Sequence, residues 1–220
     1  MNYKIVIPIV AIAIIVIGVF AYQYLSTTQT VTLNGAGATF PFPLIDKWAA
    51  EYHKIKPDVQ VNYQSIGSGG GIRQHTERTV QFGASDAPLM DEQFAAAPNT
   101  LHIPMTIGGV AVTYNVPGIS TGLKFSGEIL AEIFLGNVTK WNDSKIAELN
   151  SAVSLPNQNI MVVHRSDGSG TTYIFTNYLS DISLQWKTTV GKSTSVNWPV
   201  GIGGKGNEGV AGAVSQNPYS

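Results

Sequence analysis

The sequence predicts an α/β fold built on largely parallel strands. After Thr30, short runs rich in β-branched residues alternate with stretches whose apolar residues recur at helical spacing, an alternation typical of βαβ units. Three of the strands also lead through a turn rich in Gly, Ser or Thr into a helix. Residues 31–220 suffice for two small lobes, which we expect at 31–110 and 111–220 with a crossing near 109–115.

The first half of this region supports three strand–helix pairs. Apolar residues from Ile45 to Ile55 recur at helical spacing after Pro41, and Pro57 ends that helix. Strict alternation marks the next strand, and an apolar run marks the third. The expected elements are a strand at 31–33, a helix from 41, a strand at 59–63, a helix at 69–80, a strand at 82–85 and a helix at 91–97.

The second half begins with residues 103–115, where two apolar runs around Gly108-Gly109 predict strands. Ser126 is a good N-cap for the helix that follows, and Gly136 is a good terminator. Asp143 likewise starts a helix. The expected elements are helices at 127–135 and 144–149, a strand at 159–164, and helices at 170–179 and 209–215.

The first 30 residues do not belong to the fold. Lys4 precedes an uncharged apolar run over 5–21, close to the length of a membrane-spanning helix. Because no clear small-x-small cleavage site precedes Ser26, the run favours an uncleaved anchor over a cleaved signal peptide. A buried core helix is disfavoured, since no second, polar face exists. Residues 26–30 read as a polar tether, which places the rest outside the cytoplasm.

Composition excludes several function classes. The formal net charge is -1 and only 12% of residues are charged, which argues against nucleic acid as a partner. With no cysteine, the chain has no disulfide, thiolate metal site or cysteine nucleophile. No cluster has familiar metal-ligand spacing, so neither metal nor cofactor is expected. Nothing in the sequence requires an oligomer, and we expect a monomer.

Three segments combine a strand end, a glycine-rich turn and a helix start: 35–40, 67–71 and 167–172. Such turns present free backbone N–H groups and hydroxyls at helix N-termini, which bind anions. A single such segment is more often ordinary helix capping, but three in one region favour an anion site. Gly lets the backbone approach a ligand closely.

Charged residues sharpen the hypothesis. Arg165 ends a predicted strand just before the third turn, where its guanidinium would pair with oxyanion oxygens. Asp167 would either hold Arg165 or cap the next helix. Asp86 ends another predicted strand and, taken alone, reads as a turn aspartate.

Five segments in order carry a family resemblance: GAGATFP at 35–41, IGSGGG at 66–71, FGASDAP at 82–88, RSDGSGT at 165–171 and WPVGIGGKGN at 198–207. Together they make residues 31–220 resemble the phosphate-binding proteins of ABC-type phosphate importers. The resemblance implies a two-lobed periplasmic-binding-protein fold, type II-like, that closes over one phosphate and delivers it to transporter permease subunits.

The resemblance also implies site residues. Asp167 would pair with Arg165 beside the ligand. The phosphate contacts would fall, position by position, on Thr39, the backbone N–H of Phe40, Ser68, Asp86, Arg165, Ser169, the backbone N–H of Gly170, and Thr171.

Two departures from the family pattern stand out. Gly69 occupies a position where many relatives have Ser, which loosens the loop but leaves the Ser68 contact intact. Family members also continue beyond Ser220 to complete the first lobe. The C-terminal part therefore looks missing, and we expect a truncated form whose first lobe is incomplete.

Asp86 gives a hypothesis for ligand selectivity. Phosphate keeps at least one proton at neutral pH, whereas sulfate has none. An ionised carboxylate only accepts hydrogen bonds. It would therefore accept one from a phosphate O–H, whereas it would repel sulfate, which has the same sign of charge and no proton to donate. We therefore expect Asp86 to select phosphate, while Arg165 and the helix ends supply affinity.

Rival functions have weaker support. A site for sulfate or molybdate would share the same architecture, but Asp86 argues against it. Ser68 and Ser169 resemble hydrolase nucleophiles only in standing in Gly-rich turns, since neither lies in Gly-x-Ser-x-Gly. Residues 201–206 and 191–193 partly match nucleotide-binding motifs without the required strand–helix setting. The chain is therefore not expected to be an enzyme.

Overall fold

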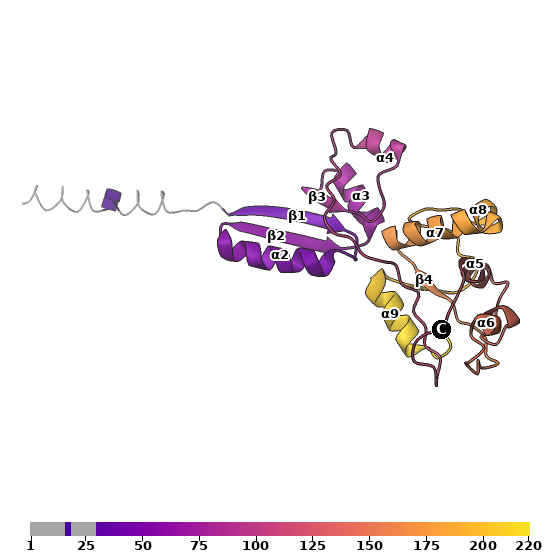
Figure 1. The fold of residues 1–220 in the computed structure, drawn as a ribbon. Helices are drawn as coiled ribbons and strands as arrows, with labels where there is room; N and C mark the ends of the chain where they lie inside the picture. Colours follow the sequence, from indigo (N-terminus) through magenta and orange to yellow (C-terminus); the bar gives the residue numbers. More distant parts are fainter. Residues whose placement is uncertain (1–15, 19–29) are drawn as a thin grey trace, which may run out of the picture.

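The computed structural model describes residues 16–18 and 30–220. Residues 16–18 are helical and, apart from Thr30, the rest of the predicted anchor and tether lies outside the described residues. No helix within the described ranges combines the length and hydropathy needed to cross a bilayer. The sheets and helices of the fold run from Val31 to Gln216 (Figure 1).

The first sheet is parallel, with strand order β2-β1-β3. Its strands are β1 (Val31–Gly37), β2 (Val59–Ser65) and β3 (Phe82–Ala84). Helix α2 (Phe42–Ile55) connects β1 to β2, and α3 (Ser68–Thr76) connects β2 to β3 on the other side of β1. Because both crossovers are right-handed in such sheets, the two helices cover opposite faces, as Figure 1 shows.

Helix α3 packs against β1 by direct backbone approach. A Cβ added at Gly71 would lie 2.5 Å from the Gly37 Cα and 2.7 Å from the Ala36 carbonyl oxygen. Interiors of proteins leave no room for such an atom without a shift of the helix. The small residues of both elements therefore fix how close α3 lies to the sheet, and with it the position of its first residue, Ser68.

The second sheet pairs β4 (Val163–Arg165) with β5 (Ile202–Gly204) in parallel. Helix α9 (Gly206–Gln216) contacts both strands. The helices around this sheet are α5 (Gly127–Leu135), α6 (Ser144–Leu149), α7 (Gly170–Ile182), α8 (Leu184–Thr189) and α9. A short helix, α4 (Asp91–Ala96), follows the first sheet in the chain.

The main apolar clusters lie beside the second sheet. Trp186 and Leu179 are fully buried and pack with Ala131, joining α5, α7 and α8. The indole N–H of Trp186 donates to the Gly191 carbonyl oxygen at 3.0 Å. A second cluster centres on Ile146 and includes residues of α5 and the segment before β4. These clusters anchor the helices from whose ends the site is built.

Helix caps agree with the sequence. Ser126 accepts a hydrogen bond from the Ile129 N–H, and Gly136 terminates α5 with φ of 81°, a left-handed conformation that favours glycine. Asp143 caps α6 through the Lys145 N–H. These signals are local, so neighbouring residues suffice to predict them.

Several predicted bounds are corrected. The strand at 31–33 extends to Gly37, so two glycines assigned to the first turn lie in β1. The helix at 69–80 begins at Ser68 and ends at Thr76. The strand predicted at 159–164 is shorter and lies later, as β4 over Val163–Arg165. The α8 helix and the β5 strand were not predicted.

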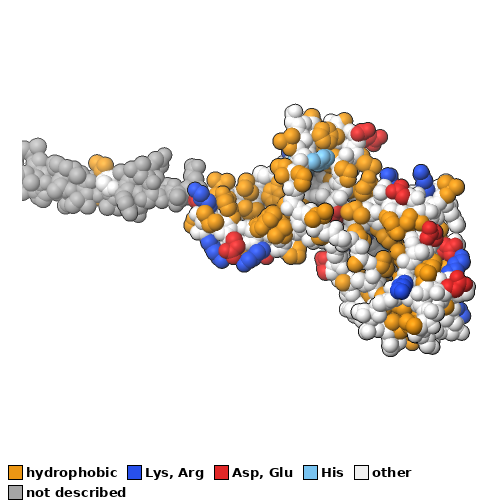
Figure 2. Space-filling view, viewed as in Figure 1, with side chains coloured by type: hydrophobic (Ala, Val, Ile, Leu, Met, Phe, Trp, Pro, Cys, Tyr) orange, Lys and Arg blue, Asp and Glu red, His pale blue; other side chains and the backbone are white. Residues whose placement is uncertain are grey.

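The two strands predicted at 103–115 are wrong: this segment has no regular structure. Its apolar residues are exposed, Ile103 by 81% and Ile107 by 96%. A strand needs a partner for its backbone groups, and no strand of the described region pairs with this one. Exposed hydrophobic side chains also include Trp48 and Ile55 of α2, and hydrophobic side chains lie among charged ones over that part of the surface (Figure 2).

Replacing Gly71 with Ala should destabilise the protein, because the new methyl group meets the backbone of β1. We expect a loss of about 1–3 kcal/mol in the free energy of unfolding, measured by urea denaturation. Gly212→Ala in α9 is the matched control, since a Cβ there meets nothing within 4 Å and Ala favours helix by ~0.5–1 kcal/mol. Equal stability changes for both variants would contradict the backbone contact.

Candidate anion-binding site

The site forms where the carboxyl ends of both parallel sheets face each other. The segments after β1, β2 and β3 carry Thr39, Ser68 and Asp86, and those after β4 and β5 begin at Ser166 and Lys205. Ligands bind at this edge of parallel α/β sheets. Two hydrogen bonds join the opposing segments: the Gly69 N–H donates to the Gly168 carbonyl at 2.9 Å, and the Gly170 N–H donates to the Ser68 Oγ at 3.0 Å.

Arg165 is the buried cation of the site, with an exposure of only 7%. Its Nε donates to Asp167 Oδ1 at 2.7 Å and its Nη2 to Asp167 Oδ2 at 2.5 Å. On the other side, Nη1 donates to Asn207 Oδ1 at 2.7 Å and more weakly to Thr39 Oγ1 at 3.4 Å. Of the two roles left open for Asp167, the structure therefore shows the pairing with Arg165.

Asp167 is ionised to lower pH than an ordinary aspartate. Burial opposes its charge, but hydrogen bonds from Arg165 and from the Gly206 N–H outweigh burial and lower its pKa. The Gly206 N–H lies 3.1 Å from Asp167 Oδ1. The carboxylate thus ties β4 to the start of α9 and keeps the guanidinium in one orientation.

The pKa of Asp86 is shifted in the opposite direction to that of Asp167. Burial raises its pKa, although the Arg165 charge and a hydrogen bond from Thr171 both act to lower it. The Asp86 N–H donates to Ser68 Oγ at 3.3 Å, which fixes the turn after β3. A half-buried carboxylate with a raised pKa, opposite a buried arginine, is typical of a functional site.

Ser68 and Gly170 lie in direct contact behind Asp86. Ser68 is fully buried, and its Oγ accepts from both the Asp86 and the Gly170 N–H groups. A Cβ at position 170 would lie 2.6 Å from the Asp86 Cβ and 2.6 Å from the Ser68 Oγ. Only glycine therefore lets the start of α7 approach this closely.

The turn after β1 is held by an aromatic stack. Tyr63 lies between Phe42 and Phe82, with ring centroids 6.2 and 6.1 Å away. Its hydroxyl donates to the Ala38 carbonyl at 2.8 Å. Burial, and secondarily the Asp86 charge, raise the pKa of Tyr63, so the phenol keeps its proton and this hydrogen bond. Thr39 is positioned by the turn that follows.

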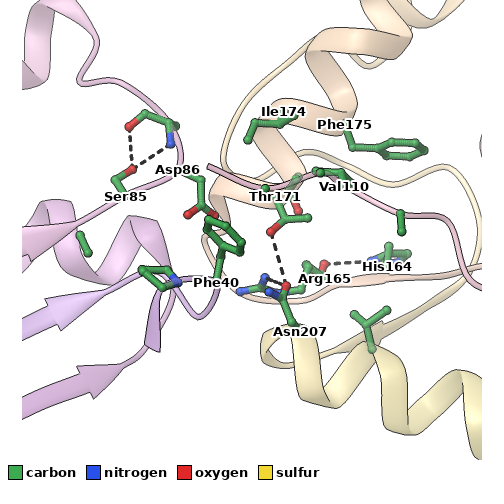
Figure 3. Close-up of a pocket in the computed structure, with 18 of the residues that line it drawn as sticks. Phe40, Ser85, Asp86, Val110, His164, Arg165, Thr171, Ile174, Phe175 and Asn207 are labelled. Atoms are coloured by element: carbon green, nitrogen blue, oxygen red, sulfur yellow. Dashed lines mark hydrogen bonds between the residues drawn. The ribbon is translucent and has the colours of Figure 1, made fainter. Parts of the chain in front are cut away.

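A cavity of about 1200 Å³ opens between the two sheets. Of the eight expected contact residues, Phe40, Asp86, Arg165 and Thr171 line it, and Figure 3 shows Asp86 and Phe40 on one side with Arg165 and Thr171 on the other. Beyond them the walls are mainly apolar, with Phe134, Trp141 and Phe175 among the lining side chains.

The other four expected residues do not line this cavity. They are Thr39, Ser68, Ser169 and Gly170, all buried. Ser169 caps α7, where its Oγ accepts from the Thr172 N–H at 3.1 Å. This is the ordinary capping role that the sequence left open. Gly170 N–H is engaged by Ser68, so these groups support the lining residues in the present conformation.

Asn207 is a site residue that sequence reasoning missed. Its Oδ1 accepts from Arg165 and lies 3.4 Å from the Thr171 Oγ1. The signal was present, because Asn207 ends the fifth family-like segment, but β5 before it was not predicted. Without that strand, nothing placed the start of α9 beside β4.

The described residues form no cluster of three or more His, Asp or Glu side chains suited to a metal ion. His164, the histidine nearest the site in sequence, stacks on Trp198 with ring centroids 4.8 Å apart. Its Nδ1 lies 2.9 Å from the Arg165 carbonyl oxygen. His164 is therefore a packing partner of the strand that carries Arg165.

Asp86→Asn should stabilise the ligand-free protein in a pH-dependent way. Because burial raises the pKa of Asp86, the folded state keeps the carboxyl proton to higher pH than the unfolded chain does. The free energy of unfolding therefore falls as pH rises from the ordinary aspartate pKa, ~3.9, through the raised pKa of the folded state. We expect a Tm a few degrees above native at pH 7 and a shrinking difference toward pH ~4.

Thermal unfolding followed by circular dichroism across this pH range measures the effect. Asp46→Asn, on the exposed surface of α2, controls for the loss of a carboxylate. A lower Tm for Asp86→Asn at pH 7, or a difference that does not change with pH, would show that burial does not dominate at Asp86.

Comparison with known proteins agrees with this architecture. Residues 24–219 match the family model of the PBP superfamily domain. The chain is 55% identical over 183 residues to "Phosphate-binding protein PstS" of Pasteurella multocida, and 54% identical over 183 residues to the protein of that name from Haemophilus influenzae. These alignments cover 83% of this chain but 53% and 54% of the relatives. The chain thus spans about half the length of the curated relatives it matches.

Solved structures show the same fold. A phosphate ABC transporter substrate-binding protein of Clostridium perfringens, crystallised with bound phosphate, superposes with a TM-score of 0.61 at 20% identity, covering 86% of this chain and 68% of that one. An ABC-type phosphate transport receptor of Vibrio cholerae gives 0.51 at 20% identity, with the same coverages. The chain therefore belongs to the PBP superfamily domain family and has its mixed α/β, periplasmic-binding-protein-like fold.

Proposed function

We propose that this chain binds inorganic phosphate outside the cytoplasm and delivers it to an ABC-type import system, without catalysing a reaction. The observation that carries the proposal is the cavity in which the Asp86 carboxylate and the Arg165 guanidinium face each other from opposite sheets. The names of the relatives at 54–55% identity support phosphate as the ligand.

Arg165 and the helix starts supply the attraction for an anion. Helices α3 and α7 begin at Ser68 and Gly170, and their N-terminal N–H groups carry partial positive charge. The expected ligand set is Thr39, the Phe40 N–H, Ser68, Asp86, Arg165, Ser169, the Gly170 N–H and Thr171.

The buried members of this set fit the proposal when the cleft adjusts around an anion. The Ser68 and Ser169 hydroxyls now accept hydrogen bonds from backbone N–H groups. A hydroxyl that accepts still has its own proton to donate, so both remain competent to contact an oxyanion. The Gly170 N–H would exchange Ser68 for a phosphate oxygen, at little net cost in hydrogen bonds.

Asp86 would select phosphate against sulfate. Its ionised carboxylate would accept a hydrogen bond from the O–H that phosphate retains, while a fully deprotonated sulfate would place a second negative charge against it. A missed buried hydrogen bond costs about 1–3 kcal/mol, more for charged groups, and sites of this kind discriminate by on the order of 10⁴–10⁵-fold. This is why phosphate is preferred to sulfate or molybdate as the proposed ligand.

The organisation we propose has two lobes at 31–110 and 111–220, closing over the ligand. Residues 1–30 would hold the chain at the membrane or direct its secretion, and a monomer would dock on the permease subunits.

A serine hydrolase is not favoured. Ser68 and Ser169 are both fully buried and bonded to backbone N–H groups, whereas a nucleophile needs a base within hydrogen-bond reach.

Calorimetric titration of the full chain in mild detergent, with phosphate and then sulfate near pH 7, tests the proposal. We expect one-to-one binding of phosphate and little response to sulfate. No heat from phosphate, or tighter binding of sulfate, would overturn it.

Asp86→Asn tests the selectivity role separately. An amide can donate to sulfate, so we expect the preference for phosphate over sulfate to fall by about 10–100-fold. The control is Asp46→Asn, which should keep the native preference. If Asp86→Asn also kept it, the carboxylate would not be the selective group.

A further inference from the structure

We propose that Asn207 is a positioning residue that sets both the affinity and the selectivity of this site, an inference that rests on the proposed phosphate binding. Asn207 contacts three of the expected ligand residues. Its Oδ1 accepts from Arg165 Nη1 at 2.7 Å and from Thr171 Oγ1 at 3.4 Å. Its N–H donates to Thr39 Oγ1 at 3.4 Å, across the cleft. Figure 3 shows the side-chain oxygen of Asn207 pointing toward both Thr171 and the Arg165 guanidinium.

The contact with Arg165 decides which of its donors face the ligand. A guanidinium has five N–H groups. Asp167 takes one from Nε and one from Nη2, and Asn207 takes one from Nη1. One N–H on each terminal nitrogen remains, which is the fork that binds two oxygens of an oxyanion. The remaining N–H of Nη1 makes only the long hydrogen bond to Thr39, which it can give up for an oxygen of the ligand. Asp167 and Asn207 therefore hold the fork from opposite sides.

The contact with Thr171 bears on Asp86. The Thr171 hydroxyl has a single proton, and it lies close enough to Asp86 to lower the pKa of that carboxyl by hydrogen bonding. When Thr171 donates to Asn207 instead, the Asp86 carboxylate loses a neutral donor, and a proton on the ligand can supply the missing hydrogen bond. Asn207 thus favours the arrangement in which Asp86 can distinguish a protonated from an unprotonated anion.

The neutral charge of Asn207 matters as much as its shape. A carboxylate would accept the same two hydrogen bonds, but the site already has Asp86 and Asp167 against one arginine. A third carboxylate beside the fork would repel an anion. Asn at this position therefore orients Arg165 without opposing the ligand.

Two substitutions separate positioning from a purely structural role. We expect Asn207→Ala to weaken phosphate binding by about 10–100-fold, because the fork loses one charge-assisted hydrogen bond, and to lower the ratio of phosphate to sulfate affinity. We expect Asn207→Asp to keep the native Tm, since the contact with Arg165 survives. Its phosphate affinity should nevertheless fall, and should recover relative to native protein as pH is lowered toward ~4.

Titration calorimetry of the full chain with phosphate and with sulfate, at several pH values and with Tm measured alongside, gives the answer. Asn177→Asp, on α7 near Lys192, controls for an added charge away from the cavity and should bind as native. If native protein binds phosphate and Asn207→Asp binds equally well at every pH, the inference is overturned and the proposed function stands. If native protein does not bind phosphate, both are overturned.

Discussion

The structure depends on the burial of one charge, the guanidinium of Arg165. Removing a cation from water is costly unless its hydrogen bonds are replaced. Asp167 supplies two of them and Asn207 a third. These partners come from the loop after β4 and from the start of α9, so satisfying Arg165 also fixes β5 and α9 against β4. Because Arg165 is buried, a neighbour that moved away would leave a buried donor without a partner, which is costly. The positions of Asp167 and Asn207 are therefore tightly constrained.

Parallel strand order explains how residues far apart in the chain meet. The first sheet places three strand ends at one edge, and the second sheet turns its own carboxyl edge toward them. Glycines then allow the approach: Gly170 leaves room for Asp86 and Ser68, and Gly69 lies against the backbone of Gly168. A Cβ at Gly69 would be 3.1 Å from the Gly168 Cα. Glycine at position 69 therefore lets the two segments approach this closely.

The sequence predicts what local chemistry determines. Ser126, Gly136 and Asp143 act on neighbouring backbone groups, so their roles as caps were predictable. The helix at α2 and the order of strands and helices over residues 31–97 were also predicted. The strands expected at 103–115 failed because a strand is completed by its neighbours, and hydrophobic residues such as Ile107 indicate only that burial would be favourable. Asn207 was missed for the related reason that the strand before it, β5, is short and rich in glycine.

For the candidate site, the sequence predicted which segments meet better than it predicted which side chains line the cavity and which make hydrogen bonds within the protein. Arg165 and Asp86 do line one cavity, whereas Ser169 is engaged as a helix cap. The raised pKa of Asp86 bears on how the site would select its ligand. Burial makes the negative charge of Asp86 unfavourable. A ligand that donates a hydrogen bond to the carboxylate would offset this penalty, whereas an unprotonated anion would add to it. On the proposed function, the burial that opposes the charge of Asp86 therefore makes the site selective for a protonated anion.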